Sequence, residues 1–265
     1  MFPELTAKKR IYAIGDVHGY VDALENMQKA IATDLDKTGI DPHDPEWDVK
    51  IIYLGDYIDR GARAFDVIEN LIAEKQKVDG IERIFICGNH DTYLERFSEG
   101  MPVAEALIWF KYGGLKTLKS YGVLHDERPH DEYFPSDVER LQLALKKALP
   151  YTHKTFVSSL KLAHQEDGYI FAHAGIDPRK PLDTQEPDDF MYIREPFLSW
   201  EEDVEAFCVH GHTIFEEPDL CKHRLGIDVG VYRHGRLGCV VLEGGEGRYI
   251  YADTKMDLFE DPPSS

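Results

Sequence analysis

Five short motifs in this chain combine carboxylate, imidazole or amide side chains with glycine or another small residue. Each follows an apolar run or turn, and in chain order they read GDVHG at 15–19, GDYIDRG at 55–61, GNHD at 88–91, AHAG at 172–175 and HGHT at 210–213. Oxygen and nitrogen ligands without thiolate are typical of sites for hard or borderline divalent cations such as Mn²⁺, Fe²⁺ or Zn²⁺. Any one motif alone is more often an ordinary turn. Five such motifs at strand ends favour a metal centre over coincidence.

The elements between the motifs indicate how these side chains could meet. Apolar runs of strand length precede the first three motifs, at 10–14, 50–54 and 83–87, and amphipathic helical patterns separate them. Strands that alternate with helices predict crossover units and a largely parallel sheet. The carboxyl ends of parallel strands lie at one edge, which is where such folds bind ligands. We therefore expect motifs that are far apart in the sequence to converge in space.

The rest of the chain predicts a helical insertion followed by more strands. Residues 92–165 read mostly as helix and are expected to cover one edge of the sheet. Strand patterns return at 169–172 and 207–209, and three final strands, at 224–228, 237–242 and 248–251, are predicted to form an antiparallel meander. We expect one domain over residues 1–253 and a flexible tail over 254–265.

Composition narrows the classes of function. The 30 Lys and Arg against 49 Asp and Glu give a net charge of −19, which repels nucleic acids and anionic membranes at long range. No apolar run approaches the roughly 20 residues of a membrane span, and the polar N-terminus does not resemble a signal peptide. The four cysteines form no CxxC pair, so free thiols and a cytoplasmic location are expected. An acidic protein that acts on phosphate needs a local positive centre, which bound cations would supply.

The order and wording of the motifs resemble a known family. GDVHG, GDYIDRG and GNHD, followed by two separated histidines, are similar to the phosphoprotein phosphatase family of calcineurin-like metallophosphoesterases, and most of all to its compact bacterial and phage serine/threonine phosphatases. The resemblance covers about residues 10–99 and 168–250. It implies an α/β (α+β) fold, a sandwich of two β-sheets flanked by helices, with the helical region as an insertion.

The resemblance also implies a role for each motif residue. It implies two divalent cations, most readily Mn²⁺, held by Asp16, His18, Asp56, Asn89, His173 and His212. It implies that His90 is the general acid with Asp59 as its partner, and that Arg60, Arg194 and Asn89 bind the substrate phosphate. The match of Arg194, in MYIREPF, is looser than the others. His210 lies two residues before His212 and could also face the metals, but His212 holds the family position before Thr213.

The expected reaction is hydrolysis of a phosphomonoester by in-line attack of a metal-bridging hydroxide, with a phosphorylated protein as the first candidate substrate and small aryl phosphates also accepted. One alternative is a dinucleoside polyphosphate hydrolase, whose second motif typically lacks the second aspartate. Asp59 therefore favours the phosphatase, whereas Asp91, in place of the usual glutamate, does not. An alternative of another class is a non-catalytic phosphate-binding module, which is disfavoured because none of the predicted ligands is missing. The sequence does not indicate the oligomeric state.

Overall fold

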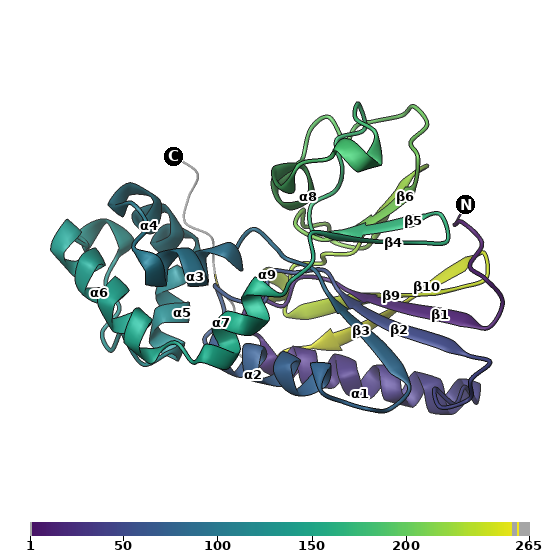
Figure 1. Cartoon of the computed structure of the whole chain (residues 1–265), viewed down its shortest axis with the longest axis horizontal. Coiled ribbons are helices and arrows are strands. Elements are labelled where there is room, and N and C mark those ends of the chain that lie inside the picture. The colour runs from purple at the N-terminus through teal and green to yellow at the C-terminus, as the bar shows by residue number, and fades with distance from the viewer. Residues whose placement is uncertain (1, 256–258, 260–265) are drawn as a thin grey trace.

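The computed structural model describes residues 2–255 and 259, and it consists of two stacked β-sheets with helices around them (Figure 1). The first sheet has the order β10 (Glu246–Asp253), β9 (Arg236–Glu243), β1 (Lys9–Ile14), β2 (Asp48–Tyr53), β3 (Ile81–Phe85). The second has the order β4 (Ala163–Glu166), β5 (Tyr169–Ala172), β6 (Phe207–His210), β8 (Arg224–Gly226), β7 (Asp219–Leu220). This is the predicted sandwich of two sheets flanked by helices.

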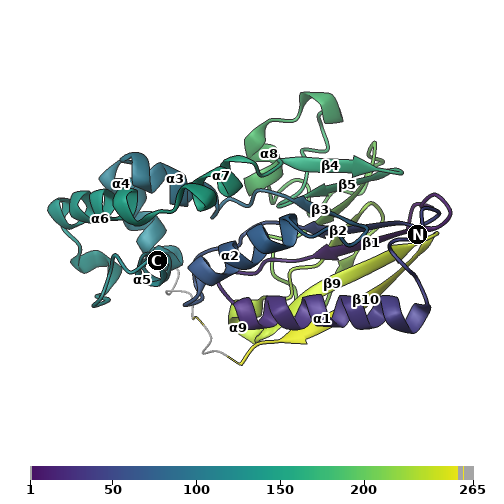
Figure 2. The same cartoon turned by 60° about the horizontal axis from the view of Figure 1, so that its bottom comes forward.

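The centre of the first sheet is parallel, as the alternating strand and helix patterns predict. Strands β1, β2 and β3 run in the same direction, and Ile14, Tyr53 and Phe85 at their carboxyl ends are in register. The crossover helices α1 (Val21–Thr38) and α2 (Ala64–Lys75) cover one face of this sheet (Figure 2). Because the three strands end at the same level, the first three motifs leave the sheet side by side.

Alternation along the strands divides the interior into two apolar layers. One set of side chains packs between the two sheets: Ile11, Ala13, Ile52, Phe171 and Val209. The other set packs under the helices: Tyr12, Ile14, Ile51, Tyr53 and Met27. Both faces of the parallel strands are therefore covered, which explains why their sequences read as continuous apolar runs.

The predicted antiparallel meander is only partly correct. Strands β9 and β10 do form an antiparallel hairpin, but β8 pairs in parallel with β6 in the second sheet. The short helix α9 (Val231–His234) lies between β8 and β9, where the chain passes from one sheet to the other. An apolar run shows that a strand forms but not which strand it joins, because the partner depends on tertiary packing.

Helices fill most of the region predicted as an insertion, and Figure 1 shows them as a lobe at one end of the sandwich. They are α3 (Thr92–Glu99), α4 (Val103–Trp109), the π-helix η1 (Phe110–Gly114), α5 (Leu115–Ser120), the 3₁₀-helix η2 (His130–Glu132), α6 (Pro135–Ala148) and α7 (Tyr151–Ser158). The last residues of the region belong to strand β4 instead. After β5, the chain forms the 3₁₀-helix η3 (Leu182–Thr184) and helix α8 (Pro187–Tyr192).

The end of the chain, predicted as a flexible tail, lies mostly outside the described residues. Among those described, Lys255 donates its backbone N–H to Asp22, and Phe259 donates to the Tyr20 hydroxyl.

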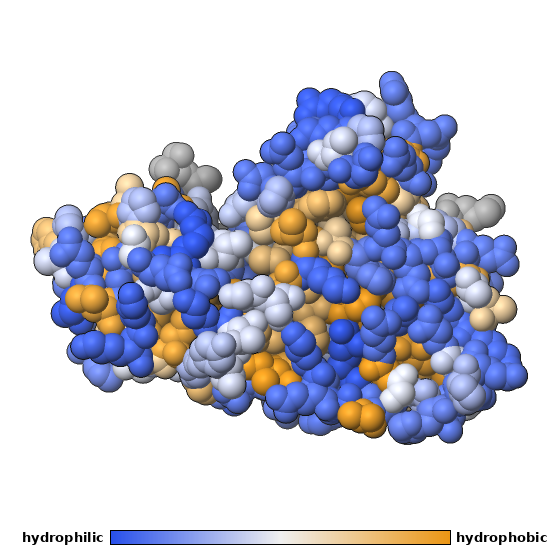
Figure 3. Space-filling model, in the orientation of Figure 1, coloured by the Kyte–Doolittle hydropathy of each residue, from blue (hydrophilic) through white to orange (hydrophobic). Residues whose placement is uncertain are grey.

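All four cysteines are free, as expected. The surface seen in Figure 3 is largely hydrophilic, with apolar side chains showing between the two sheets and over the helical lobe. Within the described chain, no helix combines the length and apolarity needed to cross a bilayer.

Candidate metal centre

The five motifs converge where the strands end, and their backbone is unusual there. Seven described residues other than glycine have a positive φ, and five of them are motif residues: His18, Asp56, Asp59, Arg60 and His212. Such conformations cost about 1–3 kcal/mol each for ordinary side chains and gather at functional sites. At these positions, tight left-handed turns aim the side chains inward.

One group of ligand atoms surrounds His173. Its Nδ1 lies 2.9 Å from the carbonyl oxygen of Leu54, so the proton belongs on Nδ1 and the Nε2 lone pair faces the site. This Nε2 lies 3.0 Å from Oδ1 of Asn89, 3.2 Å from Nδ1 of His212 and 3.4 Å from Oδ1 of Asp56. Acceptor atoms that approach one another this closely suit the ligands of a shared cation.

A second group surrounds His18. Its Nδ1 lies 2.9 Å from the carbonyl oxygen of Ile58, which leaves the Nε2 lone pair for the site. This Nε2 is 3.5 Å from Oδ2 of Asp56 and 4.0 Å from Oδ2 of Asp16. Asp16 also accepts the backbone N–H of His212 at 3.2 Å, which connects the two groups. Asp56 is common to both, so its carboxylate would contribute to both cation sites.

Burial keeps these imidazoles in the form that binds metal. It lowers the pKa of His173, and together with the Arg60 charge it lowers the pKa of His18 well below its usual range. Burial, His173 and Arg194 lower the pKa of His212 to about 2. Neutral rings with free lone pairs are ready ligands. Burial and the carboxylates of Asp228 and Asp56 raise the pKa of Asp16, because burial and neighbouring negative charges disfavour its ionised form. A cation bound among these carboxylates would offset this repulsion.

These buried His and Asp groups fit two divalent cations, and their N and O donors match the ions predicted from the sequence. Each group offers ligand atoms within 4.8 Å of one another; one contains His18, Asp56 and His90, and the other Asp56, His173 and His212. The chain therefore has the features of a dinuclear site.

His90, which belongs to the group with His18 and Asp56, is also bound to Asp59. Nδ1 of His90 is 2.6 Å from Oδ2 of Asp59, while Nε2 is 4.0 Å from Oδ2 of Asp56. The same Asp59 oxygen accepts the indole N–H of Trp109 at 2.7 Å, and the other accepts the hydroxyl of Thr117 at 2.6 Å. Asp59 is fully buried, so these donors fix its carboxylate and, through it, the ring of His90.

The two predicted arginines lie at the same cavity. The guanidinium of Arg60 stacks on Tyr232, 3.9 Å from the ring centroid, and its Nη2 is 3.3 Å from Nε2 of His90. Arg194 donates to the hydroxyl of Thr213 at 2.7 Å. Both line a cavity of about 320 Å³ together with His18, Asp56, Asn89 and His212. All ten predicted site residues therefore either line this cavity or contact a residue that does.

His210 and Asp91 lie outside this constellation. His210 is buried in β6, its Nδ1 3.0 Å from the carbonyl of Gly211 and its ring against Phe197. Asp91 accepts the backbone N–H groups of Asp56, Tyr57 and Gly88 at 2.8–2.9 Å. It links the backbone of the second motif to that of the third. An aspartate at this position, where the family usually has glutamate, therefore does not indicate the substrate.

The sequence analysis missed Asp228. This buried carboxylate follows β8, and its Oδ1 accepts the N–H of Gly230 at 2.9 Å. Burial raises its pKa to about 6 although the Gly230 hydrogen bond and the Arg60 charge oppose the rise, and it interacts with Asp16. The stretch GID at 226–228 is one more apolar strand end with a carboxylate, so the rule that selected the other motifs could have found it. Thr117 and Tyr232 gave no comparable signal.

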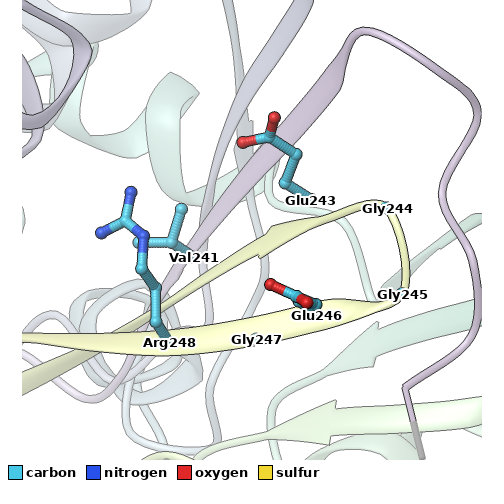
Figure 4. Close-up of a pocket in the computed structure, with 7 residues that line it drawn as sticks. All are labelled: Val241, Glu243, Gly244, Gly245, Glu246, Gly247 and Arg248. Atoms are coloured by element: carbon cyan, nitrogen blue, oxygen red, sulfur yellow. The ribbon is translucent and has the colours of Figure 1, made fainter. Parts of the chain in front are cut away.

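A larger hollow of about 500 Å³ lies at the β9–β10 hairpin and is lined by none of the metal-centre residues (Figure 4). Two of its three charged side chains are already paired, since Arg248 donates to Asp34 at 2.6 Å and Glu243 accepts from Arg10 at 2.8 Å. The chemistry of the molecule is therefore at the smaller cavity.

Residues 9–216 match the family model of the calcineurin-like phosphoesterases, so the chain belongs to that family. It is a metal-dependent phosphoesterase, a hydrolase of phosphoric ester bonds, and the non-catalytic alternative is not supported.

A curated relative is the asymmetrical bis(5'-nucleosyl)-tetraphosphatase PrpE of Oceanobacillus iheyensis, 26% identical over 240 residues, which cover 83% of this chain and 84% of the relative. The fold is shared with a putative diadenosine tetraphosphatase, at TM-score 0.57 and 19% identity over 95% of this chain and 99% of the other. It is also shared with a cold-active protein-tyrosine phosphatase of a psychrophilic Shewanella species, at TM-score 0.57 and 14% identity over 95% of this chain and 83% of the other.

Proposed function

We propose that this phosphoesterase hydrolyses a dinucleoside polyphosphate of the diadenosine tetraphosphate type. The observation that carries the proposal is the similarity to an asymmetrical tetraphosphatase over more than four fifths of both chains. The presence of Asp59 in the second motif disfavours this substrate, but it is a smaller feature than a match over 83% of the chain. The order of preference from the sequence analysis is therefore reversed.

In the proposed reaction, Arg60 and Arg194 bind the phosphate oxygens, for which the planar guanidinium is well shaped. Two divalent cations held by Asp16, His18, Asp56, Asn89, His173 and His212 supply, when bound, a nucleophile from water near neutral pH and charge that offsets the phosphate oxygens. Where the leaving group needs a proton, His90 with both ring nitrogens protonated donates the Nε2 proton to the leaving oxygen. Asp59 accepts the Nδ1–H of His90 and so fixes the orientation of the ring, and Trp109 and Thr117 donate to Asp59.

The second candidate is hydrolysis of a phosphomonoester, including a phosphorylated protein. The buried His90–Asp59 pair favours it, because a leaving alkoxide needs a proton whereas a leaving phosphate is already stable as an anion. The Shewanella phosphatase has the same fold, although at 14% identity this likeness extends to the fold alone.

One experiment separates the candidates. The protein is supplied with Mn²⁺, and kcat/KM is measured for diadenosine tetraphosphate and for phosphoserine, phosphothreonine and phosphotyrosine peptides. We expect at least tenfold preference for the dinucleotide, with AMP and ATP as products. Preference for a phosphopeptide by the same margin would make the phosphomonoesterase the correct function.

A further inference from the structure

The helical region 92–165 builds one wall of the cavity at the metal centre. Tyr93 from α3, Ile108 and Trp109 from α4 and Tyr112 from η1 line this wall. Ile108 and Tyr112 are 52% and 41% exposed, which is unusual for large apolar side chains that lie beside a charged centre. Exposed apolar groups in a concave site mark a surface that a ligand covers. This aromatic wall is therefore a candidate for substrate contact.

The wall is rigid. Trp109 is fully buried, and its indole N–H is bound to Asp59. The Tyr93 ring stacks parallel to Trp109, with ring centroids 5.8 Å apart and an interplanar angle of 4°. Gly113, next to Tyr112, packs against Arg60. A Cβ atom added to Gly113 would lie 2.4 Å from the backbone nitrogen of Arg60. A flat apolar surface held in this way loses little entropy when it binds a ring.

The wall also lies on the side of the cavity from which the leaving group departs. The ring centroids of Tyr93 and His90 are 6.5 Å apart, and Trp109 binds the same Asp59 oxygen as His90. A group attached to the oxygen that His90 protonates therefore meets the aromatic wall first.

We propose that the aromatic wall is a subsite for a flat aromatic ring carried by the leaving group. The inference rests on the proposed function and deepens it: the ring is a nucleobase of the dinucleotide, and the phenol ring of phosphotyrosine is the alternative that the test separates from it. Stacking on aromatic side chains accepts any π face, so the same wall suits both sources. It also recognises a neutral part of the substrate, which a protein of net charge −19 does not repel.

The test uses the variants Tyr112→Ala and Ile108→Ala. Their matched controls are Tyr151→Ala on α7 and Leu143→Ala on α6, two exposed residues of the same helical region that do not line the cavity. Binding to the Mn²⁺-loaded protein is measured by calorimetry with two pairs of probes that differ in the ring. AMP is compared with ribose 5-phosphate, and benzylphosphonate with ethylphosphonate.

We expect the ring-bearing probe of at least one pair to bind more tightly, and each wall variant to reduce that preference about tenfold, while the controls keep it. Loss in the AMP pair assigns a nucleobase, and loss in the benzylphosphonate pair assigns a phenol ring. Absence of any ring preference, or equal loss in the controls, overturns the subsite. Failure to cleave diadenosine tetraphosphate would overturn the proposed function alone, because both pairs report binding without turnover.

Discussion

At the scale of single residues, the chemistry depends on which nitrogen of each histidine faces the cavity. The backbone carbonyls of Leu54 and Ile58 accept hydrogen bonds from Nδ1–H of His173 and His18. Asp59 accepts the corresponding bond from His90. Each ring therefore presents Nε2 to the site, two of them as predicted metal ligands and one as the predicted acid. What distinguishes the rings is the partner of Nδ1, a carbonyl for the two predicted ligands and a carboxylate for the predicted acid.

The predicted role of His90 as a proton donor, not a metal ligand, can be tested with His90→Asn. We expect kcat for a phosphomonoester to fall about 100-fold, since proton donation is lost, while bound Mn²⁺ stays at the wild-type level. For diadenosine tetraphosphate the fall should be smaller, because its leaving phosphate needs no proton. Mn²⁺ content is measured by atomic absorption alongside turnover. Because His90 lies within 4.8 Å of other candidate ligands, a parallel loss of metal would identify it as a ligand instead.

At the scale of elements, the helical lobe contacts the candidate site directly. Trp109 and Thr117 hold Asp59, and the backbone N–H of Arg60 points to the carbonyl of Gly113 at 3.4 Å. Gly113 has φ +109° at the break inside η1, and no side chain fits there because Arg60 lies against it. The kink between α4 and α5 thus places the aromatic wall and the phosphate-binding arginine together.

The contact between Gly113 and Arg60 predicts a loss of activity in Gly113→Ala. The added methyl group would displace Arg60, and we expect kcat/KM to fall about 10- to 100-fold, measured well below the melting temperature. Gly122→Ala is the matched control, since Gly122 also has a positive φ but no atom within 4 Å of the added carbon. It should lose stability but keep its activity. If both variants retained full activity, the packing of Gly113 on Arg60 would not matter for catalysis.

A second element-scale feature is an ion cluster that joins the two sheets. Glu166 on β4 accepts from Lys9 on β1 and lies 3.0 Å from Nζ of Lys50 on β2. Burial acts to raise the pKa of Glu166, but hydrogen bonds from Lys9, His164 and Lys50 outweigh it, so the pKa is lowered. A carboxyl whose pKa is lower in the folded state stabilises the fold above its unfolded pKa, and that stability disappears as the pH falls through the folded value.

We therefore expect Glu166→Gln to lower Tm by about 3 °C at pH 7 and to differ little from the wild type near pH 3. Glu82→Gln removes another partner of Lys50, but the Glu82 side chain is 52% exposed, so its effect should be under about 1 °C at either pH. Thermal melts across this pH range provide the measurement. A Glu166→Gln deficit that persisted at pH 3 would show that packing, not charge, is responsible.

At the scale of the whole molecule, the metal centre joins loops from both sheets. Asp16, Asp56 and Asn89 come from the first sheet, and His173 and His212 from the second. Cations bound between them would hold the sandwich together at its edge, and stabilisation by ligand grows with the logarithm of ligand concentration over Kd.

Metal binding should therefore appear in stability without any assay of turnover. With Mn²⁺ at about 100 times its Kd we expect Tm to rise by about 5–10 °C over the chelator-treated protein. Asp56→Asn should remove most of this rise, since Asp56 belongs to both ligand groups, whereas Asp79→Asn, a carboxylate paired with Arg83 away from the cavity, should keep it. A rise unaffected by Asp56→Asn would place the stabilising cation elsewhere.

The sequence by itself determined the metal-binding chemistry of this protein and the strands that carry it, because a ligand motif and an apolar run are local features. Asp16, Asp56 and Asn89 could be predicted to meet, since parallel strands end at a common edge. Only the tertiary structure decided that β8 leaves the predicted meander, that left-handed turns aim His18 and His212, and that Trp109 and Thr117 hold Asp59. Each of these depends on contacts between residues distant in the chain, which no local pattern encodes.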